Sequence, residues 1–244
     1  MFTFSRGKPI VIDCFTADAS AYRAAKIDYA NKFIPDWWKS LSTPDESKFS
    51  TVANMKYCTG FTSQFKRGAV LPMWSDLDFE VPPVDSYDYR WHFADSRSML
   101  EVHTEEQWGD FFSQAKFQHI KLVSPWKFRC SDSVDFAYVP PTWWDYEAMS
   151  AVKFLPGVVN FKYQTSTNIN LVITKRDQPF VQRFNYMQPM LHLVPLSERP
   201  LKIKTHLVTV PEIEKLVSRQ VSFVNSYGKT KKQCPFGFTK KGLL

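Results

Sequence analysis

Short apolar runs of strand length, each followed by Pro, Asp, Ser or Asn, fill the second half of this sequence. Such spacing favours an antiparallel sandwich, jelly roll or closed barrel over βαβ units, which need a helix between successive strands. We therefore expect a mainly β (α+β) fold with a few peripheral helices: an antiparallel β-sandwich or jelly roll, or a cupin-like barrel. The runs are 119–123, 126–129, 134–139, 158–163, 168–174, 180–184, 190–196 and 201–210.

The first half mixes strands and helices. Strands are expected at 9–15 and 51–57, and most clearly at 87–93, where aromatic and polar residues alternate. Helical spacing predicts four helices. The first helix is expected over 18–33, with Thr16 or Asp18 as its cap and Pro35 as its stop, and the second over 58–65, ending at Gly68. The third is expected over 104–115, where a capping box begins it, and the fourth over 211–224, with Pro211 in its first turn. Cys58 shares a helix face with Phe61 and Phe65, so we expect a small buried hydrophobic residue; it is not expected to be a nucleophile, since no base lies near it in sequence.

Composition indicates one folded domain. Hydrophobic residues make up 44% and aromatic residues 16% of 244 residues, while only 8 are Gly, so the chain can bury a core and is a poor match for a disordered segment. No internal repeat or composition break divides it. We expect a single β-rich domain over residues 1–228 and a basic tail over 229–244. No run of apolar residues is long enough to cross a membrane.

Four scattered cysteines and the lack of a secretory leader predict reduced thiols and a protein that is not secreted.

The formal charge of +7 is concentrated at the C-terminal end. Seven of the 31 Lys and Arg residues follow Glu214, where there is no Asp or Glu, so residues 1–214 hold 24 basic and 24 acidic residues. The tail interleaves lysines with aromatic rings, which suits weak, salt-sensitive binding of nucleic acid. Its candidate contact residues are Lys229, Lys231, Lys232, Phe236, Phe238, Lys240 and Lys241. A solvated tail, or one docked on an acidic subunit, is the alternative.

Two pairs of adjacent tryptophans are candidates for a surface that binds a partner. They are Trp37 with Trp38, and Trp143 with Trp144. Burying all four large rings in one domain is demanding, and exposed tryptophans are common in protein interfaces. Packing against the core is the competing interpretation.

One arrangement of histidines has the logic of a metal site. His103 and Glu105 are two residues apart, so on an extended strand both point to one face. With His192 or His206 they would form the two-histidine, one-carboxylate set of a non-haem Fe(II) oxygenase of the 2-oxoglutarate type, and Arg199 or Lys202 would bind the acidic cosubstrate. In the alternative, Glu105 lies in the first turn of a helix and the histidines are hydrogen-bonded strand residues. The sequence contains no P-loop, G-x-G-x-x-G, G-x-S-x-G or H-E-x-x-H motif.

Several phrases resemble an uncharacterised family, a domain of unknown function found in tailed phages of marine bacteria, including cyanophages, and in some bacteria. They are Ile34-Pro-Asp-Trp-Trp-Lys39, Met55-Lys-Tyr-Cys58 with Gly68 and Leu71-Pro-Met73, Lys121 with Ser124-Pro-Trp126, and Phe180-Val-Gln-Arg-Phe184 with Val194-Pro195. The resemblance spans about residues 30–200. It departs from the family pattern at Cys58-Thr59-Gly60, where prolines follow the cysteine, and at Asp177-Gln178-Pro179, where a glycine-containing turn is usual. It implies a phage source and no particular activity.

These observations lead to three hypotheses. The first is a phage-encoded, non-catalytic β-sandwich protein without a cofactor, which binds a protein partner or forms a homo-oligomer as a virion accessory or host-interaction factor. The second is the cupin-like iron oxygenase, and the third is a nucleic-acid binder acting through the tail. We expect it in the cytoplasm of the infected cell or associated with the virion, and not in a membrane.

Overall fold

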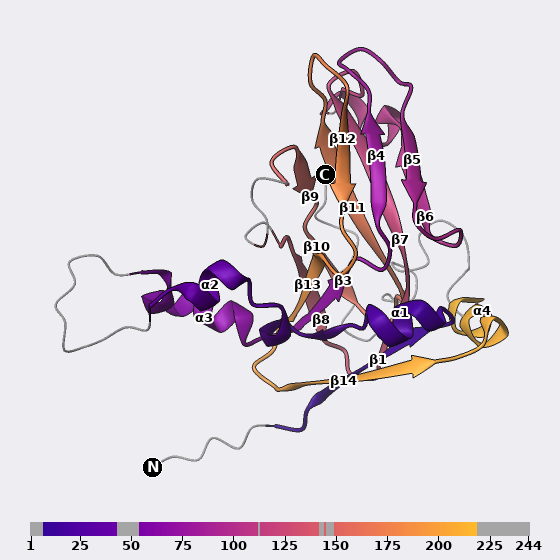
Figure 1. Ribbon diagram of the computed structural model, residues 1–244. Coiled ribbons are helices and arrows are strands. Elements are labelled where there is room, and N and C mark those ends of the chain that lie inside the picture. The colour runs from indigo at the N-terminus through magenta and orange to yellow at the C-terminus, as the bar shows by residue number, and fades with distance from the viewer. Residues whose placement is uncertain (1–6, 43–53, 112, 142–143, 145–148, 219–244) are drawn as a thin grey trace, which may run out of the picture.

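Strands of three sheets dominate the computed structural model, which describes residues 7–42, 54–111, 113–141, 144 and 149–218 (Figure 1). Sheet A runs β14 (Leu201–Leu207), β1 (Ile10–Thr16), β7 (Phe117–Cys130), β11 (Ser166–Thr174) and β9 (Val152–Phe154), and β6 (Met99–His103) also pairs with β7. Sheet B runs β10 (Gly157–Asn160), β8 (Asp135–Val139), β13 (Pro189–Pro195), β3 (Ala69–Pro72) and β2 (Asp28–Tyr29). Sheet C runs β12 (Phe180–Phe184), β4 (Leu77–Val81) and β5 (Arg90–Phe93). Neighbouring strands are antiparallel throughout the described residues, except that β1 and β14 are parallel.

Strand β7 organises sheet A and unites two of the expected runs. One of its edges pairs along its length with β11, while β6 pairs with residues 119–123 and β1 with residues 127–130 of the other edge. Pro125 lies in the gap between those two partners, and the β11 pairing shifts register between Ser166 and Asn168 at the same level. Because proline has no N–H to donate, it is tolerated inside a long strand where the ladder is interrupted. The runs 119–123 and 126–129, which were expected to be two strands, therefore belong to one long strand.

Sheets B and C are joined by a continuous two-stranded ribbon. The β3–β13 pair of sheet B leads into the β4–β12 pair of sheet C. At the junction the Met73 N–H donates to the Gln188 carbonyl at 2.7 Å, and the Met187 N–H donates to the Met73 carbonyl at 2.9 Å. Met187, between β12 and β13, has a φ of 64°, a left-handed conformation that is uncommon for residues other than glycine and occurs mostly in turns. The ribbon thus extends the second layer beyond sheet B.

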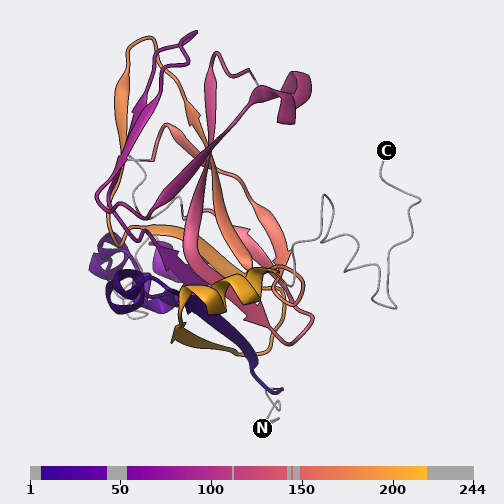
Figure 2. The same cartoon turned by 90° about the vertical axis from the view of Figure 1, so that its right-hand side faces the viewer.

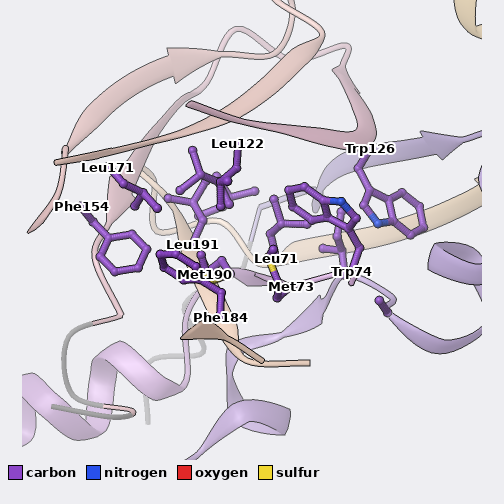
Figure 3. Packing of buried hydrophobic residues seen from close by; sticks show 14 of the residues in the cluster. Leu71, Met73, Trp74, Leu122, Trp126, Phe154, Leu171, Phe184, Met190 and Leu191 are labelled. Atoms are coloured by element: carbon purple, nitrogen blue, oxygen red, sulfur yellow. The ribbon is translucent and has the colours of Figure 1, made fainter. Parts of the chain in front are cut away.

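The hydrophobic core lies between sheet A and the layer made by sheets B and C. Alternate residues of β1 are buried, as are Leu122 and Leu171 of sheet A and Leu71 and Leu191 of sheet B. Figure 3 shows these four side chains turned toward one another. This alternation on facing sheets is what a sandwich requires. The predicted mainly β fold with a few helices is therefore confirmed.

The strand predictions hold best in the second half of the chain. Residues 180–184 form β12 as expected, and the runs at 134–139, 158–163, 168–174, 190–196 and 201–210 correspond to β8, β10, β11, β13 and β14. The expected strand at 9–15 corresponds to β1.

The helix expected over 18–33 is wrong beyond its first turns. Asp18 caps α1 (Ala19–Ala24) as predicted, and its carboxylate accepts hydrogen bonds from the Ser20 and Ala21 N–H groups. After Ala24 the chain extends, and β2 pairs with β3 before a 3₁₀ turn, η1 (Ala30–Phe33). Strand pairing with a buried partner outweighs the helical spacing of the aromatic residues here.

The amphipathic helix expected over 104–115 is also wrong. Two 3₁₀ turns are present, η3 (Glu105–Gln107) and η4 (Gly109–Phe111), and the Thr104 side chain makes no capping hydrogen bond. Phe111, an aromatic residue within the range of that expected helix, is 85% exposed. Figure 2 shows these turns, in magenta, standing out from the strands. Trp108 packs on His119 of β7 whereas Phe111 is exposed, so the apolar residues do not share one covered face that would stabilise a helix.

Three smaller expectations fail as well. Residues 55–57 of the expected strand at 51–57 form a 3₁₀ turn, η2 (Met55–Tyr57), and residues 51–53 are outside the described residues. Only Arg90–Phe93 of the run at 87–93 is strand; Trp91 is exposed on this outer strand of sheet C, and Tyr87 is exposed in the segment before it. Cys58 is exposed at the N-cap of its helix rather than buried on its face.

The remaining helices lie outside the sandwich. α2 (Asp36–Ser40) and α3 (Thr59–Phe65) form a helical arm that stands out to one side of the sheets, while α4 (Val210–Ser218) follows β14 (Figure 1). Pro211 is in the first turn of α4 as expected. In the described part of the chain, every helix falls short of what a membrane crossing would need.

Candidate binding surface

The two adjacent tryptophans of α2 have different environments. Pro35 precedes the helix with a φ of −67° and serves as its N-cap residue, so it opens the helix where the sequence suggested a stop. Neighbouring residues on a helix point about 100° apart, because 3.6 residues make a turn. Trp38 is therefore buried while Trp37 is 41% exposed.

Trp38 fixes the helical arm. Its ring lies 4.9 Å from that of Phe65 and 6.3 Å from that of Phe61, both on α3. Trp144 meets Phe65 edge-on at 6.4 Å from a third segment. The candidate role of Trp38 in a partner surface is therefore wrong, because that ring packs α2 against α3. Trp143 is outside the described residues.

A hollow of about 400 Å³ lies beside Trp37. Its apolar lining comes from Phe33, Ile34, Pro35, Trp37, Trp144 and Pro189. The structure thus brings together Trp37 and Trp144, two of the four predicted surface tryptophans. Ile34 opens the phrase Ile34–Lys39 noted above, and Phe33 precedes it directly. Pro189 was not singled out from the sequence, because it begins β13 far along the chain. Pro35 beside paired tryptophans was the available signal.

The charge at this hollow is balanced locally. Asp36, the charged residue of the described lining, accepts a hydrogen bond from Lys39 Nζ at 2.8 Å. That hydrogen bond and the lysine charge hold the pKa of the Asp36 carboxyl below its usual value. The hollow is therefore an open depression of mixed character, in which aromatic and proline side chains lie beside an exposed ion pair.

The predicted iron ligands are not brought together. No group of three His, Cys, Asp or Glu side chains in the described residues is placed to hold a metal ion. The chain turns into η3 after Thr104, so the extended geometry assumed for His103 and Glu105 is wrong, and the Glu105 carboxylate instead accepts from the Gln114 N–H.

The other two histidines have separate partners. Buried His192, on β13, has its Nε2 atom 2.6 Å from the Arg67 carbonyl. His206, on β14, has its Nε2 atom 2.8 Å from Asp13 Oδ1 and stacks on Phe15. Both histidines are therefore hydrogen-bonded strand residues, as the alternative interpretation of the sequence expected.

His103 has a neighbour that the sequence did not indicate. It faces His119 across the β6–β7 pair, and the two rings stack with centroids 4.5 Å apart. Trp108 Nε1 donates to His119 Nδ1 at 3.0 Å, and His119 Nε2 lies 3.3 Å from Asn170 Oδ1. Register between β6 and β7 creates this pair, and β6 was not predicted.

In the described residues, the two proposed cosubstrate residues make no hydrogen bond or ion pair with a histidine. Arg199 Nη2 pairs with Asp132 Oδ2 at 2.5 Å, and its Nε donates to the Lys8 carbonyl. Lys202 is exposed on β14. The predicted nucleic-acid residues from Lys229 to Lys241 are outside the described residues.

Comparison with protein-family models gives no match for this sequence, and a search of curated proteins gives none either.

Proposed function

We propose that this chain is a phage-encoded, non-catalytic binding protein, a virion accessory or host-interaction factor, which holds a partner protein at the Trp37 hollow. The observation that carries the proposal is the 41% exposed ring of Trp37 beside an open depression with aromatic and proline walls, on an arm that stands out from the β-sheets (Figure 1). Large exposed aromatic rings next to a pocket are typical of the residues that dominate protein interfaces.

The lining favours a protein segment over a small metabolite. Small-molecule sites usually place several polar groups around an apolar cavity to fix the ligand's orientation. Here the charged member of the described lining, Asp36, is already engaged by Lys39. Aromatic and proline walls instead suit an extended segment that inserts a proline or aliphatic side chain. The occupant we propose is such a segment of a separate protein.

A matched pair of variants tests this function. Trp37 and Trp91 are 41% and 42% exposed, but Trp91 lies on the outer strand of sheet C. A photoreactive side chain at position 37 during infection identifies the partner, and the dissociation constant is then measured with purified proteins. Trp37→Ala should weaken binding by about thirtyfold or more, as expected for an interface hot spot, and Trp91→Ala by less than about twofold.

Equal dissociation constants for the two variants would contradict the proposal. Light scattering after size exclusion provides a second check. A dimer that Trp37→Ala converts to a monomer would identify a second copy of this chain as the occupant, and would overturn the proposal of a separate partner.

A further inference from the structure

A second hollow, of about 350 Å³, lies where the end of α3 meets the β13–β14 connection. Its lining includes Tyr29, Lys66, Arg67, Gly68, Glu198 and Arg199. The end of the helical arm and the connection between β13 and β14 therefore surround a basic depression, which is distinct from the Trp37 hollow.

The backbone that presents Lys66 and Arg67 is held in place from sheet B. His192 Nε2 donates to the Arg67 carbonyl at 2.6 Å, and the ring is fully buried. Gly68 follows with a φ of 82°, a conformation that permits the tight turn into β3. The positions of the two cationic residues are thus fixed by groups that belong to the core.

The opposite wall is fixed as well. Arg67 Nη2 donates to the Ser197 carbonyl at 2.7 Å, which ties the end of α3 to the β13–β14 connection. Arg199 is held by Asp132 and by the Lys8 carbonyl. A ligand would meet walls that are already organised, so little ordering free energy is needed on binding.

The charge on these walls is uneven. In the described part of the chain, neither Lys66 nor Arg67 has a carboxylate within ion-pair distance, whereas the Arg199 charge is matched by Asp132. Glu198 supplies a single negative charge to the lining. The depression therefore keeps a net positive charge, with two cations available to one anionic group.

We propose that this basic hollow binds a small molecule through its phosphate group, with Lys66 Nζ and the remaining Arg67 N–H groups as the donors. Lysine and arginine both make charge-assisted hydrogen bonds to phosphate oxygens. The volume suits a compact metabolite, at the lower end of the range for small-molecule sites. Glu198 on the wall repels additional negative charge, which disfavours a polyanion such as a nucleic-acid strand.

The test uses the full chain, with inorganic phosphate, glucose 6-phosphate and glucose as probes in an amide NMR titration. Lys66→Gln removes the charge of the ammonium group, and in the described residues the Lys66 side chain makes no hydrogen bond or ion pair, while its backbone N–H still donates to the Ser63 carbonyl at the end of α3. Lys202→Gln removes the same charge from exposed β14, where Lys202 is not among the residues lining the hollow. We expect glucose 6-phosphate and phosphate, but not glucose, to shift the amides of residues 66–68. Lys66→Gln should weaken that binding about tenfold, and Lys202→Gln less than about twofold.

Equal weakening by the two variants, or shifts spread over the basic surface, would show general charge attraction and overturn the proposal. A single-stranded DNA oligonucleotide that binds at residues 66–68 more tightly than glucose 6-phosphate would also overturn it. Melting temperatures of both variants near that of the wild type confirm that the comparison concerns folded protein.

Discussion

His119 is held as a neutral imidazole by its hydrogen bonds. Its Nδ1 accepts from Trp108, so its Nε2 carries the proton and donates to Asn170. Burial, followed by the charges of His103 and Lys121, lowers the pKa of His119, and the hydrogen bond to Asn170 opposes this only in part. Protonation at Nδ1 would break the bond to Trp108, which anchors η3 and η4.

The stability of the fold should therefore fall as the pH drops below about 6.5. Because the folded protein binds this proton more weakly than the unfolded chain, the stabilisation is complete above the unfolded pKa of about 6.5 and is lost as the pH falls through the folded value. His192 acts in the same direction, since burial lowers its pKa too.

Urea unfolding midpoints at pH 7.5, 6.5 and 5.5 check this expectation. The midpoint of the wild type should fall across the series. His119→Gln should flatten the profile in part, while His92→Gln, on the exposed face of β5, should leave it unchanged. Parallel profiles for the wild type and His119→Gln would show that His119 does not set the pH dependence.

At the same scale, the sequence identified the right residues more readily than their roles. Trp37 and Trp38 stood out beside Pro35, but which ring is exposed depends on where α3 packs, and that is a tertiary property. His103 and Glu105 have a metal-like spacing only if the strand continues past Thr104, and it does not. The spacing of residues along the chain does not predict where a strand ends.

At the scale of elements, the turn from α3 into β3 depends on Gly68. Its φ is 82°, and a Cβ added there would lie 2.2 Å from the Leu193 carbonyl oxygen on the neighbouring strand β13. Gly109 has a φ of 55° with nothing within 4 Å of such a Cβ. Both glycines therefore have a positive φ that disfavours other residues, but only at Gly68 would a side chain also collide with a neighbouring strand.

Alanine at each position separates the two requirements. Gly109→Ala should cost about 1 kcal/mol of unfolding free energy, from the positive φ alone. Gly68→Ala should cost more than about 3 kcal/mol, because β3 and β13 must also move apart. Chemical denaturation of both variants measures the difference. Equal costs would mean that the turn relaxes without disturbing sheet B.

The elements that could be predicted are those whose own residues determine them. β12 and β11 show apolar runs bounded by turn residues, and Asp18 caps α1 through its own carboxylate. The helix expected over 104–115 failed because Trp108 contacts His119 of β7 while Phe111 is exposed, so its apolar residues do not share one covered face. The short strands β2 and β9 form because they pair with β3 and β11, and such pairing cannot be predicted from the few residues of β2 and β9 alone.

At the scale of the whole molecule, the charge is divided between a formally neutral body and a basic end. Removing the residues after Gly228 deletes five lysines and lowers the formal charge from +7 to +2. If the tail binds nucleic acid, binding of single-stranded DNA should weaken steeply between about 50 and 200 mM salt and disappear in the truncated form. Fluorescence anisotropy measures both effects, and unchanged binding after truncation would reject a role for the tail.

The parallel pairing of β1 with β14 has a consequence for synthesis on the ribosome. β1 is made first, but its partner along that edge begins at Leu201, near the end of the described chain. Until then the nascent protein presents an unpaired strand edge, which can recruit other chains. The exposed edge of β1 should therefore make the nascent chain dependent on chaperones until β14 is synthesised. It should also lower the solubility of chains that end before β14.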